Sequence, residues 1–255
     1  MKVLITGGSG KLGSELANHL SSQGICVATL GRRSLSSEFR NYSWSLGMTP
    51  RPDAFFGVDC LVHLAWATND RGLFDFHINV GGSRQLFEFA EIVGVKTINL
   101  SSLSAMNPNS MYGKAKESVE QSNLNGINLR VAKIEFPTEF VELSSIEKVA
   151  RKLIVLPVPK DLSVHVVEIG RVLEEITYYI KGDFNPGTYT FASEKYDLSH
   201  YLKKYHGLKS FPIPMYLIKS FFTFCKFSRT RKGSVLHDRW ASLLSTDQAL
   251  RNLSR

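Results

Sequence analysis

The stretch "KVLITGGSGKLGSELANHL" at residues 2–20 decides the fold. Residues 2–6 form an apolar, β-branched run, which predicts a short buried strand. The run ends in the glycines of "TGGSGKLG" (6–13), and residues 11–24 then place leucine and alanine at helical spacing before a glycine stop. The sequence therefore predicts a strand, a glycine loop and a helix in direct succession.

The same alternation of strand and helix continues along the chain. We expect strands at 25–30, 59–66, 96–101, 127–133 and 187–193, and helices at 77–93, 112–124, 144–153, 166–180 and 197–207. Alternation of this kind favours a parallel sheet with helices on both faces. We therefore predict an α/β protein with a Rossmann-type, doubly wound parallel sheet over 1–135. A smaller C-terminal α/β lobe over 136–255 would pack on it and return some elements to the core domain.

The net charge of +8 is concentrated near the C-terminus. Residues 203–255 carry 11 Lys/Arg and 2 Asp/Glu, whereas 1–202 carry 20 and 21. A basic excess attracts an anionic substrate, a membrane surface or nucleic acid, but it is also typical of a solvated face. The segment 211–232 is apolar and then basic. It is expected either to pack its aromatic face on the lobe or to lie on a membrane surface. No nucleic-acid reading module accompanies it, and we expect no nucleic-acid partner.

Other features exclude several classes of protein. The start "MKVLITGG" has no secretory pattern, and no apolar run reaches the ~18 residues of a membrane span, so a cytoplasmic protein is expected. The three cysteines and the histidines have no metal or disulfide spacing, and no metal site is predicted. Cys26 and Cys60 lie in apolar runs and are expected to be buried thiols. His63, in a strand-like run, is expected to be a satisfied core histidine.

Gly7, Gly10 and Gly13 recur every three residues in the loop. A dinucleotide needs its pyrophosphate against backbone N–H groups at a helix N-terminus, and a β-carbon would block that approach. A glycine triplet also occurs in ordinary turns. Its position between a strand and an amphipathic helix favours dinucleotide binding.

The end of the second strand reads "TLGRRS", with Gly31, Arg32, Arg33 and Ser34. Enzymes that select NAD usually carry a carboxylate about here, to hold the ribose hydroxyls. This chain has two guanidinium groups instead, which pair well with phosphate. We therefore predict NADP(H) as the preferred cofactor, with NAD(H) possible in its place. The alternative is that one or both arginines only face solvent.

A second candidate site follows the strand "KTINLS". Ser102 comes just beyond it, at the edge of a parallel sheet where ligands bind. Tyr112 and Lys116 are four residues apart and share one face of a helix. A nearby ammonium favours the phenolate, and a serine hydroxyl can polarise a carbonyl oxygen. Tyr-x-x-x-Lys alone is common by chance, but after a glycine loop the three residues form a coherent proton-transfer site.

The chain resembles the extended short-chain dehydrogenase/reductase family, in its branch of nucleotide-sugar epimerases, dehydratases and 4-keto reductases. The resembling stretches are "TGGSGKLG" (6–13), "VDCLVHLAW" (58–66), "NVGGSRQLFEFAEIVGVK" (79–96), "LSSLSAM" (100–106), "YGKAK" (112–116) and "NLRVAK" (128–133). Fainter similarity lies in "LPVPKDLSVHVVEIGRVL" (156–173) and "RWASLLSTDQAL" (239–250).

The resemblance implies roles for individual residues. Tyr112 would be the acid/base, Lys116 its partner and a ligand of the nicotinamide ribose, and Ser102 the catalytic serine, with Ser101 and Ser104 as rival assignments. The residues implied in cofactor binding are Gly7, Ser9, Gly10, Lys11, Leu12, Gly13, Arg32, Arg33, Leu64, Ala65, Trp66, Tyr112 and Lys116.

The chain also departs from the family pattern. It has Met106-Asn107 where a Tyr-Gly is usual, Arg130-Val131-Ala132 in place of Arg-Pro-Gly, and Val166-Val167 in place of an Asp pair. The segment 135–160 is short for a nucleotide-sugar lid.

The sequence is compatible with two functions. The first is an oxidoreductase that reduces or epimerises C4 of a nucleotide-linked sugar by hydride transfer. The second is a dinucleotide-binding sensor or scaffold of the same fold without turnover. The resemblance also implies a homodimer formed through a helix pair that includes 112–124.

Overall fold

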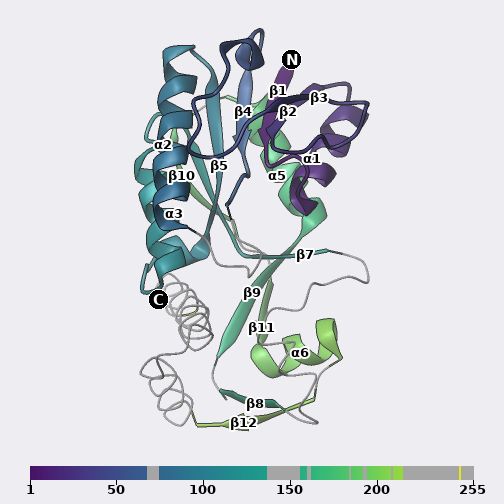
Figure 1. The fold of residues 1–255 in the computed structure, drawn as a ribbon. Coiled ribbons are helices and arrows are strands. Elements are labelled where there is room, and N and C mark those ends of the chain that lie inside the picture. The colour runs from purple at the N-terminus through teal and green to yellow at the C-terminus, as the bar shows by residue number, and fades with distance from the viewer. Residues whose placement is uncertain are drawn as a thin grey trace. The chain divides into compact units, whose positions relative to one another are not determined.

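A seven-stranded parallel sheet organises the first part of the structure, a computed structural model of the chain (Figure 1). The structure describes residues 1–67, 75–136, 156–159, 162–183, 185–191, 194–207, 209–214 and 247. These residues form two units. Unit 1 comprises 1–102, 115–131 and 169–191, and unit 2 comprises 103–114, 132–168 and 192–255. The division predicted after residue 135 stays a prediction.

Unit 1 contains the predicted doubly wound sheet. Its strands are β1 (Lys2–Thr6), β2 (Cys26–Gly31), β3 (Arg40–Ser43), β4 (Cys60–His63), β5 (Lys96–Ser102), β6 (Ile127–Val131) and β10 (Gly187–Phe191). They lie in the order β10-β6-β5-β4-β1-β2-β3, and every neighbouring pair is parallel. The order reverses at β1, between β4 and β2. Ligands bind at such a switch point in open parallel sheets, beyond the carboxyl ends of the strands.

Helices cover both faces of this sheet. They are α1 (Lys11–Ser22), α2 (Phe76–Ile92), α3 (Met111–Gln121) and α5 (Ile169–Lys181), with a 3₁₀ turn η1 at Pro52–Phe55. Figure 1 shows α1 and α5 on one face and α2 and α3 on the other. The Rossmann-type fold predicted from the sequence is therefore confirmed for this part of the chain.

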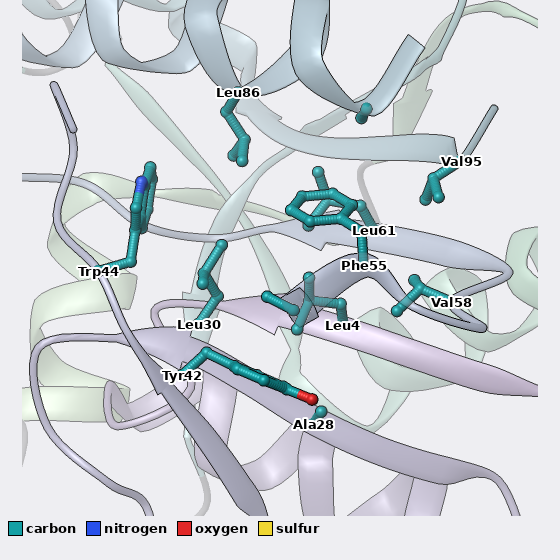
Figure 2. Close-up of a cluster of buried hydrophobic side chains, with 12 residues drawn as sticks. Leu4, Ala28, Leu30, Tyr42, Trp44, Phe55, Val58, Leu61, Leu86 and Val95 are labelled. Carbon is teal, nitrogen blue, oxygen red and sulfur yellow. The ribbon is translucent and has the colours of Figure 1, made fainter. Parts of the chain in front are cut away.

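An apolar cluster fixes α2 against the sheet (Figure 2). Leu4, Leu30 and Leu61 come from three neighbouring strands and are fully buried beneath Leu86 of α2. Phe55, from η1, stacks edge-on against Phe89 of α2 with ring centroids 5.0 Å apart. Burial of such side chains stabilises the fold by roughly 2 kcal/mol each. The carboxyl ends of β1 and β4, which carry the candidate site, are thus held on a rigid base.

Unit 2 consists of short elements. These are η2 (Leu103–Ala105), β7 (Lys133–Glu135), β8 (Leu156–Pro159), β9 (Ser163–Glu168), β11 (Glu194–Asp197), α6 (Leu198–His206) and β12 (Ser210–Ile213). Strand β9 pairs with β7 in parallel and with β11 in antiparallel orientation, and β8 pairs with β12. A core of Val158, Val164, Val166, Tyr201 and Leu202 joins α6 to these strands.

Several sequence expectations change here. The helix expected at 166–180 begins only at Ile169, because Val164 and Val166 alternate inward as part of strand β9. Strand β3 was not expected, since Tyr42 is the one buried residue of its four. The helix expected at 144–153 and most of the segment 211–232 lie outside the described residues. Among the helices that are described, none combines the length and apolar composition that crossing a membrane requires.

Candidate active site

The glycine loop between β1 and α1 closes tightly on itself. Gly7 has a φ of 71°, and its carbonyl oxygen accepts the N–H of Gly10 at 2.9 Å. A β-carbon at Gly13 would lie 2.3 Å from this same oxygen and 2.8 Å from the Cα of Gly8. Because both neighbours are backbone atoms, a side chain at Gly13 would force the strand-to-helix turn apart.

The first turn of α1 is open to an anion. Its N-cap residue, Gly10, has extended backbone angles and no side chain, so no side-chain oxygen caps the helix. Ser9, Gly10 and Lys11 are exposed, Leu12 is half-buried and Gly13 is buried. The backbone N–H groups of a helix N-terminus, the positive end of the helix dipole and a cradle that a β-carbon would fill together fit the pyrophosphate of a dinucleotide.

Two arginines lie directly beyond β2. Arg32 and Arg33 are exposed and follow Gly31, the last residue of the strand. Thr6 pairs with Leu30 across the parallel strands β1 and β2, so the arginines leave the sheet at the same edge as the glycine loop. The Thr29 hydroxyl donates to Asn41 Oδ1 at 2.8 Å, which ties β2 to β3 near this point.

The loop after β4 passes beside Gly7. A β-carbon on Gly7 would meet the Cα and N atoms of Ala65 at 3.0 Å. Thr6 Oγ1 accepts the N–H groups of Leu64 and Ala65, each at 3.1 Å. Asn79 of α2 accepts the N–H of Ala67 at 2.8 Å and donates back to its carbonyl oxygen at 2.9 Å. The half-buried residues Leu64, Ala65 and Trp66 are therefore anchored next to the glycine loop.

The serines at the end of β5 occupy different environments. Ser101 is buried, and its hydroxyl donates to the Glu120 carboxylate. Glu120 is itself buried and accepts from Arg130 Nε at 2.9 Å and Nη2 at 2.6 Å. Ser102, the last residue of the strand, is half-buried, and Ser104 is buried in unit 2. The Ser101 hydroxyl is thus engaged in an internal ion-pair network.

Lys116 is a buried cation. Its side chain extends from α3 to β5, where Nζ donates to the carbonyl oxygen of Leu100 at 3.0 Å. Burial lowers the pKa of Lys116 to about 8, against the opposing effect of the Glu120 carboxylate, which raises it. The ammonium also lies 4.2 Å from the centroid of the Trp66 ring. A lysine perturbed by burial at the ligand-binding edge of a sheet is typical of a functional site.

Tyr112 lies in the first turn of α3, one helical turn before Lys116. Ser110 starts this helix, because its hydroxyl accepts the N–H of Gly113 at 2.9 Å. A β-carbon at Gly113 would lie 2.5 Å from the carbonyl oxygen of Ser104, so only glycine fits after the tyrosine. Tyr112 is half-buried.

The structure adds residues that sequence reasoning did not single out. Thr6 and Asn79 fix the loop after β4, and Glu120 and Arg130 form the ion pair behind Ser101. A signal for Glu120 was present, since it lies four residues after Lys116 on the same helix face. Thr6 and Asn79 act through contacts more than ten residues away, which sequence spacing does not reveal.

The sequence also led to expectations for one histidine and two cysteines. His63 is a satisfied core histidine as predicted, with both ring nitrogens hydrogen-bonded. Cys60 is buried, and burial raises the pKa of its thiol to about 12. The expectation for Cys26 was wrong. It is the first residue of β2 and is exposed, because the strand's burial begins only at Val27.

Comparison with known proteins agrees with this arrangement. The model of the NAD dependent epimerase/dehydratase family matches residues 3–130. No curated protein matches the sequence.

Among solved structures, a short-chain dehydrogenase/reductase superfamily protein from Agrobacterium tumefaciens with bound NAD is 18% identical, with a TM-score of 0.68 over 84% of this chain and 85% of that chain. The UDP-glucose 4-epimerase of Thermus thermophilus in complex with NAD is 20% identical, with a TM-score of 0.66 over 84% and 86%. The UDP-N-acetylglucosamine 4-epimerase of Bacillus cereus is 16% identical, with a TM-score of 0.65 over 85% and 87%.

The structural likeness, at these identities, concerns the fold. The family match covers the strand, glycine loop and helix, the loop after β4, and the segment with Ser102, Tyr112 and Lys116. The chain belongs to the NAD-dependent epimerase/dehydratase family of enzymes.

Proposed function

We propose that this protein is an NADP(H)-dependent oxidoreductase that acts at C4 of a nucleotide-linked sugar, either as a 4-keto reductase or as a 4-epimerase. The observation that carries the proposal is the buried ammonium of Lys116, which lies at the carboxyl end of the sheet one helical turn after Tyr112. A buried cation at this position stabilises a phenolate and so makes tyrosine a usable base near neutral pH.

The glycine loop would hold the cofactor. Gly7, Gly10 and Gly13 leave room for a pyrophosphate against the first turn of α1. Arg32 and Arg33, exposed beyond β2, would pair with a phosphate on the adenosine ribose. Leu64, Ala65 and Trp66 would lie beside the bound cofactor. The nicotinamide ring, when bound, accepts or supplies the hydride.

The chain's own residues would handle the proton. Tyr112 takes the hydroxyl proton of the sugar in oxidation and returns one to the oxygen in reduction. Lys116 balances the charge of the phenolate and also reaches the nicotinamide ribose. The Ser102 hydroxyl donates a hydrogen bond to the reacting oxygen, where negative charge develops. Reduction and epimerisation use the same groups and differ in whether the cofactor leaves after one hydride transfer.

Nucleotide titration followed by a substrate panel tests the proposal. Purified protein is titrated with NADPH and NADH by fluorescence, and 4-keto nucleotide sugars and UDP-hexoses are then screened by absorbance of the reduced nicotinamide and by product analysis. We expect tighter binding of NADPH and turnover of one panel member. Tyr112→Phe should keep nucleotide binding and lower turnover by about 100-fold or more.

The same experiment addresses the second candidate function. The replacement of a proline by Val131 after Arg130, and the short segment 135–160, favour a dinucleotide-binding sensor without turnover. Tight nucleotide binding with no turnover across the panel would support that alternative. Absence of binding by either nucleotide would contradict both functions.

A further inference from the structure

The indole ring of Trp66 covers the ammonium group of Lys116. Lys116 Nζ lies 4.2 Å from the ring centroid. The two residues come from separate segments, since Trp66 lies three positions after the end of β4 and Lys116 is in the second turn of α3. Lys116 is only 9% exposed, and its Nζ is also tied to Leu100 O at 3.0 Å. The ammonium is therefore confined between a strand carbonyl and an aromatic face.

Such a contact matters most where water is excluded. The face of an indole attracts a cation through its quadrupole, and the attraction grows when the cation is desolvated. Burial is the main cause that lowers the pKa of Lys116 to about 8. An aromatic face is a form of compensation that needs no second buried charge.

Three other titratable residues lie near Lys116: Glu120, His63 and Tyr112. Glu120, one turn later on α3, raises the pKa of Lys116, but its oxygens are shared with Arg130 and Ser101. His63 on β4 is buried, and burial lowers its pKa to about 3, so it is neutral near pH 7. Tyr112 lies one turn earlier on the same helix. Trp66 supplies a neutral partner that favours the charged form of the lysine.

We propose that Trp66 is a positioning residue for Lys116: its ring holds the lysine side chain in place and keeps it cationic beside the reacting groups. The catalytic part of this inference rests on the proposed function, in which Lys116 balances the phenolate of Tyr112. Loss of the ring leaves the ammonium buried with less compensation. Lys116 then loses its proton at a lower pH, and its side chain gains conformations that are not productive.

NMR titration of the ligand-free protein tests the contact directly. The protein is labelled with [ε-¹³C]lysine, and the resonance that disappears in Lys116→Arg is assigned to Lys116. In Trp66→Leu, which keeps the site apolar, the midpoint of this resonance should fall by roughly 0.5–1 pH unit. Trp66→Phe keeps an aromatic face and should recover most of that loss.

A matched control removes an aromatic ring that contacts another lysine. Lys204 Nζ lies 4.5 Å from the ring of Tyr196, and Lys204 is exposed on α6. Tyr196→Leu should leave the titration of Lys116 unchanged. An unchanged midpoint in folded Trp66→Leu would overturn the inference. If Trp66→Leu does not fold, the protein is labelled with 5-fluorotryptophan, because the chain has three tryptophans, and the ¹⁹F resonance of Trp66 is assigned by its loss in Trp66→Phe. This resonance must titrate with a midpoint that is lost in Lys116→Met, and a pH-independent resonance would overturn the inference instead.

Kinetics separate this inference from the proposed function. With an active substrate, the alkaline limb of the kcat/KM profile, which reports the free enzyme, should move to lower pH in Trp66→Leu by the same amount as the NMR midpoint. The KM for substrate should change less than kcat. A shifted NMR midpoint in a protein that turns over nothing would contradict the proposed function and leave the contact established. Turnover with an unshifted midpoint and an unshifted limb would overturn the role of Trp66 alone.

Discussion

Thr6 Oγ1 and His63 Nδ1 lie 2.8 Å apart in the interior of unit 1, and this hydrogen bond fixes the tautomer of the histidine. Thr6 Oγ1 already accepts the N–H groups of Leu64 and Ala65, so its own hydrogen is directed to Nδ1. His63 therefore carries its proton on Nε2, which donates to Ser83 Oγ at 2.9 Å. The neutral imidazole links β1, β4 and α2 directly beneath the loop that carries Trp66.

Replacement of this histidine should change how stability depends on pH. Burial lowers the pKa of His63 from 6.5 to about 3. Between these values the unfolded chain binds a proton that the folded chain does not, so stability falls as the pH falls. From pH 7 to pH 5 the free energy of unfolding should drop by roughly 2 kcal/mol more in wild type than in His63→Gln.

Urea unfolding at the two pH values measures this difference. His63→Gln should be less stable than wild type at pH 7, because the amide replaces only part of the hydrogen-bond network. The six other histidines are common to both proteins and cancel in the comparison. Parallel pH dependence in the two proteins would mean that folding does not lower the pKa of His63.

The glycine loop offers a paired test of cofactor binding. In Gly13→Ala the β-carbon would lie 2.3 Å from Gly7 O, and the loop must shift. We expect a loss of about 2 kcal/mol in stability and at least a tenfold weaker dinucleotide affinity by fluorescence titration. Gly81→Ala, in the exposed middle of α2, meets open space and should stabilise the protein by about 0.5–1 kcal/mol without changing affinity. Equal dinucleotide affinity in the two variants would show that the glycine loop does not bind the dinucleotide.

Local patterns in the sequence predicted the elements of unit 1 well. Strand β1 has the predicted bounds, and α1, α2 and α3 begin within one residue of the expected starts, because apolar periodicity and glycine stops act over a few neighbouring residues. Strand β9 was partly predicted as helix. Its Val164 and Val166 are buried by pairing with β7 and β11, which depends on segments about thirty residues away on either side.

The chemistry of the site was predicted only in part, because it too depends on contacts between residues that are far apart in the sequence. The residue types and their order point to a proton-transfer site. The sequence favoured Ser102 and kept Ser101 as a rival assignment. Spacing did not show that the two serines face opposite sides of β5 and that Ser101 reaches Glu120. The contact of Trp66 with Lys116 joins residues fifty positions apart and depends on how β4 and α3 lie against β5.

The two serines should therefore respond differently to substitution. Ser102→Ala should lower kcat by roughly 10- to 1,000-fold and change stability by less than about 0.5 kcal/mol, since the residue is half-buried at the strand end. Ser101→Ala should lower the free energy of unfolding by about 1–3 kcal/mol, because it removes a donor from the buried Glu120 carboxylate. It should change kcat little. Turnover assays and thermal unfolding of both variants measure this split. The reverse pattern would assign the catalytic hydroxyl to Ser101.

Cofactor selection should depend on the arginines beyond β2. Arg32 and Arg33 are exposed where the sheet edge meets the glycine loop, and no acidic residue follows β2 before Glu38. In the double variant Arg32→Ser/Arg33→Ser we expect NADPH to bind about 10- to 100-fold more weakly, through loss of charge-assisted hydrogen bonds to a ribose phosphate. NADH affinity should stay within about threefold of wild type, since NADH carries no such phosphate. Titration at two salt concentrations adds an internal check, because screening should weaken NADPH binding to wild type more than to the variant. Tighter binding of NADH than of NADPH by the wild-type protein would show that the arginines face solvent only.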